Sequence, residues 1–152
     1  MPLIPLTEKD YEPAAEALAG HWKERGMDVY DKEWAMAYLR QGHQRDVISD
    51  HFFLYKDEHH HHVGIVSLLR YEGDVAEIRD EIVFSQRDKK RSLEHMLQAV
   101  VRRARGEGIR KLYSYSLYQH LSTYMALGFQ QEGVLKDHFK TGENLVIMSL
   151  FP

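Results

Sequence analysis

The sequence contains no cysteine, which excludes disulfide bonds, thiolate nucleophiles and cysteine-ligated zinc. It also lacks any apolar run long enough to span a bilayer. The first residues, Met1 to Leu6, are too short for the apolar core of a signal peptide. We therefore expect a cytoplasmic protein with no membrane partner.

The chain also lacks a strong charge of either sign. Its 20 lysines and arginines and 23 acidic residues give a formal net charge of −3, so we expect no general attraction to nucleic acid. Hydrophobic residues at 43% and charged residues at 28% are ordinary for a globular protein. A length of 152 residues predicts a single domain that covers residues 1–152.

One stretch, residues 76–104, joins a strand pattern to a helix pattern. Residues 76–84 alternate apolar and charged side chains, which predicts a β-strand. A regular strand would separate two sets of side chains, with Ile78, Ile82 and Phe84 on one face and Glu77, Arg79 and Glu81 on the other. Apolar residues then recur at helical spacing from Leu93 to Ala104, and Gly106 and Gly108 end that helix.

The segment between this strand and this helix carries four cations, Arg87, Lys89, Lys90 and Arg91. The free N–H groups and the dipole of a helix N-terminus favour anions, so the segment is a candidate anion-binding site. The alternative is an ordinary connection between a strand and a helix with a solvated run of charges.

The rest of the chain predicts the element order β-α-α-β-β-β-α-β-α-β-β. Asp10 is the expected N-cap of the first helix, which Gly26 ends. The other predicted elements are a strand at residues 3–6, a second helix at 31–42, a hairpin of strands 51–56 and 63–71, a strand at 110–117, a short helix at 121–127 and a hairpin of strands 129–136 and 144–151.

Four consecutive histidines, His59 to His62, occupy the first predicted hairpin turn. Consecutive side chains on a turn diverge and lack a fixed ligand geometry, so we expect a solvated turn and no metal site. Metal binding by these histidines is the alternative.

Three segments of the sequence resemble those of a known protein family. Residues 124–129 read Tyr-Met-Ala-Leu-Gly-Phe and match the Tyr-x-x-Leu-Gly-Phe motif of the GNAT N-acetyltransferase superfamily. Residues 76–97 resemble the family's strand, pyrophosphate loop and helix, and residues 132–139 with 148–150 resemble its closing hairpin. The resemblance covers nearly the whole chain. It implies an α/β fold of the GNAT type, with a mixed central β-sheet of about seven strands flanked by helices.

The resemblance also implies acetyl-CoA as co-substrate and a set of cofactor-binding positions. These are Ile82, Val83, Arg87, Asp88, Lys89, Lys90, Arg91, Ser92, His120 and Tyr124. The loop departs from the family pattern, because Lys90 and Ser92 stand where the family has glycine, and glycine or alanine. Glycine lets backbone N–H groups approach the pyrophosphate closely, whereas the Cβ of Lys90 crowds it.

Three residues are candidates for the chemistry. By resemblance, Tyr124 supplies a phenol that protonates the departing thiolate, Glu77 lies where some members keep a glutamate base, and Glu81 is the second choice for that base. Core packing is the alternative role of Tyr124, and an ion pair with Arg79 is the alternative role of Glu77. The backbone N–H near Val83 would polarise the thioester carbonyl.

The function that this resemblance implies is N-acetyltransfer from acetyl-CoA directly to a primary amine of a small molecule or a protein. A non-catalytic acyl-CoA-binding or interaction module with the same fold is the alternative that the loop leaves open. Many relatives dimerise, so a homodimer is one possible assembly.

Overall fold

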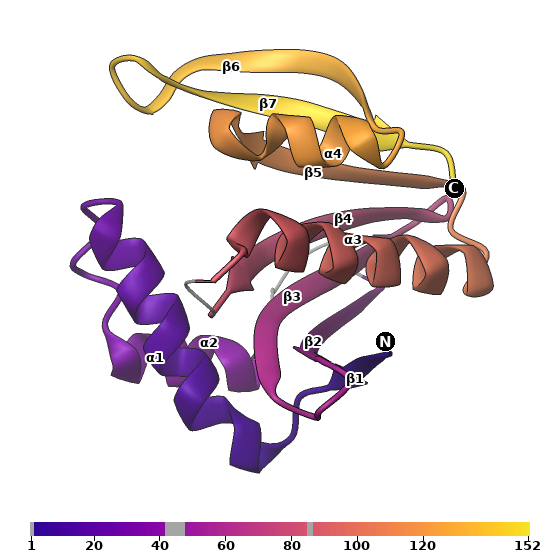
Figure 1. Ribbon diagram of the computed structural model, residues 1–152. Helices are drawn as coiled ribbons and strands as arrows, with labels where there is room; N and C mark the ends of the chain where they lie inside the picture. Colours follow the sequence, from indigo (N-terminus) through magenta and orange to yellow (C-terminus); the bar gives the residue numbers. More distant parts are fainter. Residues whose placement is uncertain (1, 42–47, 85–86) are drawn as a thin grey trace.

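The computed structural model describes residues 2–41, 48–84 and 87–152. The helices are α1 (Glu8–Glu24), α2 (Lys32–Gln41), α3 (Lys89–Gly106), the 3₁₀ turn η1 (Tyr118–His120) and α4 (Leu121–Ala126). The strands are β1 (Leu3–Pro5), β2 (Ser49–Lys56), β3 (His62–Tyr71), β4 (Val75–Val83), β5 (Lys111–Leu117), β6 (Gln130–Lys140) and β7 (Glu143–Leu150). The predicted α/β class and element order are confirmed (Figure 1).

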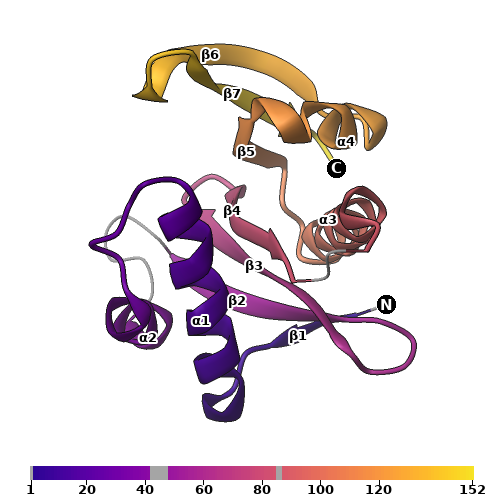
Figure 2. The ribbon, with the colours of Figure 1, turned by 60° about the vertical axis from the view of Figure 1, so that its left-hand side comes forward.

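Seven strands form one mixed sheet in the order β1-β2-β3-β4-β5-β7-β6. All neighbouring pairs are antiparallel except β4 and β5. The two apolar cores lie on opposite faces of this sheet: α3 and Tyr124 of α4 belong to one core, and α1 with α2 belong to the other. Figure 2 shows α1 and α2 on one side of the sheet and α3 on the other.

The parallel strands β4 and β5 pair over only part of their length. Their register runs from Val75 opposite Lys111 to Ile78 opposite Ser114. Beyond that point β5 continues to pair with β7, up to Leu117, and β4 continues along β3. The C-terminal halves of β4 and β5 therefore part, and the middle of the sheet opens there (Figure 1).

β4 contains a β-bulge. Ile65 pairs with Ile82 and Ser67 pairs with Arg79, so two β4 residues, Asp80 and Glu81, lie opposite one β3 residue. Asp80 has φ +55°, in the left-handed region.

The bulge reverses the faces of the following residues. Ile78 lies in the core under α3, whereas Ile82 lies in the core under α1 and Phe84 packs against that second core. The prediction of a regular strand was therefore wrong, because the extra residue moves every later side chain to the other face. The side chains of Glu77 and Glu81 consequently project from opposite faces of β4.

The first helix begins earlier than the sequence predicted. Thr7 is the N-cap, and Asp10 is the third helical residue, whose Oδ2 accepts hydrogen bonds from Thr7 N at 2.9 Å and Thr7 Oγ1 at 2.7 Å. The prediction of Asp10 as N-cap was therefore wrong by about one helical turn. In this capping box Thr7 is the N-cap, and Asp10 is the third helical residue, which bonds back to it. Across residues 2–41, 48–84 and 87–152, each helix is too short or too polar to cross a bilayer.

Candidate active site

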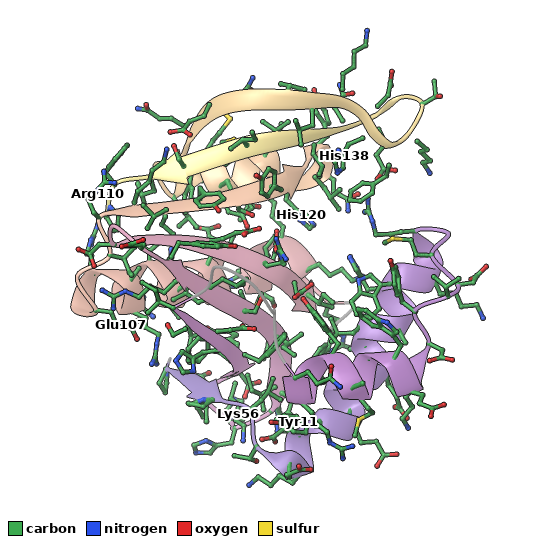
Figure 3. The ribbon with its side chains drawn as sticks, turned by 180° about the vertical axis from the view of Figure 1, so that it is seen from behind. Tyr11, Lys56, Glu107, Arg110, His120 and His138 are labelled. Carbon is green, nitrogen blue, oxygen red and sulfur yellow. The ribbon has the colours of Figure 1, made fainter. Side chains whose placement is uncertain are left out.

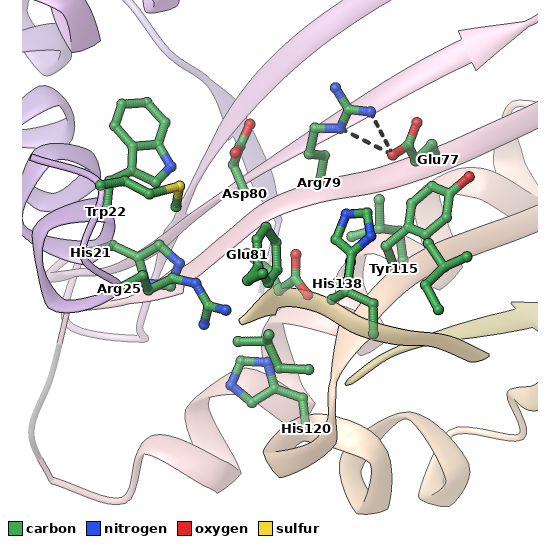
Figure 4. A pocket seen from close by; sticks show the side chains of 16 residues that line it. His21, Trp22, Arg25, Glu77, Arg79, Asp80, Glu81, Tyr115, His120 and His138 are labelled. Carbon is green, nitrogen blue, oxygen red and sulfur yellow. Dashed lines mark hydrogen bonds and ion pairs between the residues drawn. The ribbon is translucent and has the colours of Figure 1, made fainter. Parts of the chain in front are cut away.

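Two cavities meet where β4 and β5 part. The larger, of about 870 Å³, lies among α1, the end of β4, the start of α3 and the η1–α4 segment, and is called the groove below. The smaller, of about 450 Å³, lies among α1, β4, β5 and the β6–β7 hairpin, and is called the pocket. Four residues line both cavities and so mark their junction: His21, Arg25, Glu81 and His120 (Figure 4).

The groove has a backbone wall and a cationic end. Ile82 and Val83 form its β4 side, and Lys89 and Lys90 extend it to the first turn of α3. The Phe84 N–H donates to Val63 O at 2.8 Å. Because hydrogen bonds alternate along an antiparallel ladder, the preceding N–H, that of Val83, points away from β3 and toward the gap between β4 and β5.

Four other predicted cofactor residues, Arg87, Asp88, Arg91 and Ser92, do not line the groove. Arg91 and Ser92 line a separate cavity of about 600 Å³ beside the turn of the β2–β3 hairpin. Arg87 and Asp88 are exposed and are not among the groove-lining residues. Asp88, at φ +51°, is the N-cap of α3, and its carbonyl accepts the Ser92 N–H at 3.0 Å. Of the four predicted cations, the fold therefore brings Lys89 and Lys90 to the groove.

Glu81 is the carboxyl group at the junction of the two cavities. Its Oε1 lies 3.0 Å from the Tyr124 hydroxyl, which donates to it. Burial raises the pKa of Glu81 to about 7, although the bond from Tyr124 acts in the opposite direction. A carboxyl group with this pKa can accept and release a proton near neutral pH.

Tyr124 stands directly behind Glu81. Its side chain is 0% exposed, and its ring packs edge-to-face on Phe129 with 5.0 Å between ring centroids. The hydroxyl also lies 3.0 Å from Ser114 Oγ. Burial and the adjacent Glu81 raise the pKa of Tyr124 well above its ordinary value. Tyr124 thus packs in the core and is linked to the junction by its hydrogen bond to Glu81.

Glu77 lines the pocket, and its carboxylate already forms an ion pair with an arginine. The residue is 2% exposed, and its Oε1 accepts from Arg79 Nε at 3.0 Å and pairs with Arg79 Nη2 at 2.9 Å. Its Oε2 accepts from the Tyr71 hydroxyl at 2.8 Å. The structure thus contains the ion pair that was the alternative reading of this residue (Figure 4).

His120 lies at the end of η1, where the chain turns into α4. Burial, with His21 and Arg25 nearby, lowers the pKa of His120 to about 4, so the ring is neutral at pH 7. Its Nδ1 is buried and makes no hydrogen bond with any residue in the described part of the chain. An imidazole nitrogen in this state can bond a ligand at the junction.

Three further residues of the site were not predicted from the sequence: His21 of α1, Arg25 at the C-cap of α1, and His138 of β6. His120 and His138, labelled in Figure 3, come from separate elements and line the same pocket. The ion pair from Arg25 Nη2 to Glu143 Oε1, at 2.6 Å, ties α1 to the β6–β7 hairpin. No local pattern marks these residues, because only the folded chain brings α1 and β6 together.

The histidine turn is organised by an aspartate. Asp57 Oδ1 accepts the N–H groups of His59 and His61, each at 2.9 Å, and these bonds close the turn. Within the described ranges, no three His, Asp or Glu side chains gather to hold a metal ion.

Comparison with known proteins gives likenesses of structure only. No family model and no curated protein sequence matches the chain. An aminoglycoside 6'-N-acetyltransferase complexed with coenzyme A is 13% identical with a TM-score of 0.75, covering 99% of this chain and 96% of that one. The dodecameric spermidine N-acetyltransferase from Vibrio cholerae is 18% identical with a TM-score of 0.74, covering 98% and 92%.

A third solved structure carries the family name. It is a GNAT family acetyltransferase from Elizabethkingia anophelis with acetyl-CoA bound, 16% identical with a TM-score of 0.60, and the match covers 68% of this chain and 77% of that one. The sequence motifs, the parted strands and these likenesses agree, and the chain therefore has the fold of the GNAT N-acetyltransferases.

Proposed function

We propose that residues 1–152 act as a single domain that transfers an acetyl group from acetyl-CoA directly to a primary amine. The observation that carries this proposal is the meeting of the groove and the pocket at Glu81. Two reactants that enter from opposite sides would meet beside a carboxyl group whose pKa is about 7. Structures of the same fold with coenzyme A or acetyl-CoA bound support acetyl-CoA as the co-substrate.

The groove suits acetyl-CoA chemically. Lys89 and Lys90 provide two cations at the first turn of α3, where free N–H groups and the helix dipole also favour phosphate. The Val83 N–H would donate a hydrogen bond to the thioester carbonyl and stabilise the negative charge that develops on its oxygen. His120 would bond the arm of the cofactor through its unpartnered Nδ1.

The transfer needs two proton movements. The neutral amine attacks the thioester carbon, the new C–N bond forms and the C–S bond breaks. Glu81 takes the proton that the amine nitrogen loses. The protonated Glu81, held by the Tyr124 hydroxyl at 3.0 Å, then supplies the proton that the leaving thiolate needs. The pair ends in its starting protonation state.

Acetyl-CoA binding and turnover are separate tests of this proposal. Calorimetry measures acetyl-CoA affinity, and release of free CoA thiol in the presence of primary amines measures turnover. Absence of binding at low salt and millimolar acetyl-CoA refutes the proposal. Binding without thiol release from any amine would instead assign the chain to the alternative, a non-catalytic acyl-CoA-binding module, which the lysine at position 90 had suggested.

Two matched variants identify the base. Glu81→Gln should keep acetyl-CoA affinity and lower turnover by about 10²–10⁴-fold. Glu77→Gln should lower turnover by a factor that does not change with pH, because Glu77 is held by Arg79 and Tyr71. A deficit of Glu77→Gln that shrinks as pH rises would transfer the role of base to Glu77.

A further inference from the structure

We propose that Tyr38 of α2 and Asp80 of β4 are positioning residues for the acetyl transfer. The hydrogen bond between them holds the β4 bulge in place, and the bulge brings the Glu81 carboxyl group to the junction of the groove and the pocket. Neither residue takes part in the proton movements, so each acts through Glu81. This inference rests on the proposed function and adds two residues that its mechanism does not use.

Asp80 has a backbone conformation that needs support from its surroundings. Its φ of +55° is uncommon for a residue with a Cβ, and such residues persist where neighbouring groups hold them. Asp80 Oδ2 accepts a hydrogen bond from the Tyr38 hydroxyl at 2.9 Å. Ser67 Oγ of β3 lies 3.0 Å from the carbonyl oxygen of Arg79 and 3.3 Å from Asp80 Oδ2. The bulge is thus held through its backbone and through its carboxylate.

The Tyr38 hydroxyl is a donor in a fixed position. The ring stacks on Trp34, with 5.1 Å between ring centroids and 21° between planes, and meets Phe52 of β2 edge-on with 5.6 Å between centroids. Burial and the neighbouring Asp80 raise the pKa of Tyr38 well above its ordinary value, so the phenol keeps its proton. The bond to Asp80 therefore ties the bulge to a helix that packs on the sheet.

The bulge decides which side of β4 Glu81 faces. In a regular strand residues two apart share a face, so Glu81 would lie on the same face as Glu77 and Arg79. The extra residue turns Glu81 to the opposite face, where its Oε1 accepts from the Tyr124 hydroxyl at 3.0 Å. Figure 4 shows Asp80 and Glu81 pointing in different directions from adjacent positions. Loss of the bulge would therefore take the Glu81 carboxyl group away from the junction.

Removal of the Tyr38 hydroxyl tests the inference. Tyr38→Phe keeps the ring contacts and removes the bond to Asp80. We expect kcat, measured by thiol release, to fall about 5- to 20-fold, because a small displacement of a catalytic group is costly. Tyr30→Phe is the matched control: Tyr30 packs on Trp34 in the same aromatic cluster, with 4.6 Å between ring centroids, and the variant should keep the wild-type kcat. A wild-type kcat in Tyr38→Phe would overturn the inference.

The Glu81→Gln background shows whether the loss of kcat passes through Glu81. If Tyr38 acts by placing the carboxyl group, Tyr38→Phe should lower kcat by less than about twofold when residue 81 is already glutamine. A general loosening of the fold would lower kcat by the same factor in both backgrounds, and that result would overturn the inference.

Two substitutions of Asp80 separate the hydrogen bond from the charge. Asp80→Asn should keep kcat within about threefold of the wild type, because asparagine tolerates the left-handed conformation and its Oδ1 accepts the bond from Tyr38. Asp80→Ala tolerates that conformation poorly and has no acceptor, so its kcat should fall at least as far as that of Tyr38→Phe. Equal kcat values for Asp80→Asn and Asp80→Ala would contradict the proposed role of the bond.

NMR titration of the Glu81 carboxyl carbon gives a readout that needs no turnover. The groups around Glu81 that titrate or carry charge include Glu77, Asp80, Tyr124, His21, Arg25 and His120. Tyr38→Phe leaves all of these in the chain, and we expect the midpoint to fall from about 7 toward 4.5 as the carboxyl group moves from burial into water. An unmoved midpoint would overturn the inference. A lowered midpoint in a protein that binds acetyl-CoA but releases thiol with no amine would instead refute the proposed function and leave the placement of Glu81 by Tyr38 standing.

Discussion

Replacing Glu81 by Gln should stabilise the protein at alkaline pH while it slows the reaction. Burial raises the pKa of Glu81 from 4.5 to about 7 in the folded state. The folded protein therefore holds this proton more tightly than the unfolded chain does. The favourable contribution of the protonated group is complete below about pH 4.5 and is lost as pH rises through about 7. The difference between 4.5 and about 7 corresponds to about 3 kcal/mol.

Glutamine is the informative replacement because its Oε1 can still accept the hydrogen bond from Tyr124. Urea unfolding of both proteins at pH 4.5, 6 and 8 measures the effect. The free energy of unfolding of Glu81→Gln, minus that of the wild type, should increase by about 3 kcal/mol from pH 4.5 to 8 and then level off. In kinetics, the wild-type rise in kcat/KM up to about pH 7 should be absent from the variant.

Glu132→Gln is the control for the direction of the effect. Glu132 is on the surface of β6, and its bond to Lys111 lowers the pKa of its carboxyl group. A lowered pKa contributes stability that is present above about pH 4.5 and is lost as pH falls, so this variant should show a small change of the opposite sign. If the unfolding free energies of wild type and Glu81→Gln run parallel at all pH values, the raised pKa of Glu81 is refuted.

Three other substitutions test separate parts of the structure. Tyr124→Phe should lower turnover and move the pH–rate inflection upward, because the bond from Tyr124 lowers the pKa of Glu81; an unmoved inflection would contradict this. Lys90→Ala should weaken acetyl-CoA affinity, measured by calorimetry, about 2- to 5-fold at low salt and hardly at all in 1 M salt, because salt screens the exposed charge of Lys90. A loss of affinity that persists in 1 M salt would contradict this explanation. Gly64→Ala should lower the free energy of unfolding by about 1–3 kcal/mol, because the new Cβ would lie 2.6 Å from Ile82 O. Gly20→Ala, whose Cβ would lie in open space in α1, should not destabilise the protein, so equal urea midpoints for the two variants would contradict this prediction.

The sequence by itself determined the element order and the fold class of this protein. Alternating and helical periodicities, with Gly26 and Gly128 at helix ends, are local properties that the chain carries before it folds. The motif that begins at Tyr124 then pointed to the GNAT fold, and the parted sheet confirms that fold. Tyr124 and Glu81 were both candidates from sequence, although nothing local indicated that one donates to the other.

Only the tertiary structure decided which side each β4 residue faces. The bulge is defined by β3, because two residues of β4 lie opposite Val66, and the left-handed conformation of Asp80 is held by bonds from Tyr38 and Ser67. These partners are distant in sequence, so the alternation of residues 76–84 carries no sign of the extra residue.

The pocket and the proton affinity of its carboxyl group also required the folded chain. His21 and His138 come from α1 and β6, more than a hundred positions apart in the sequence, and line one pocket only because the fold brings these two elements to the same end of the sheet. The raised pKa of Glu81 depends on burial, which is a property of the surroundings and not of the residue. Local sequence patterns determine the helices and strands, whereas the candidate active site depends on long-range packing.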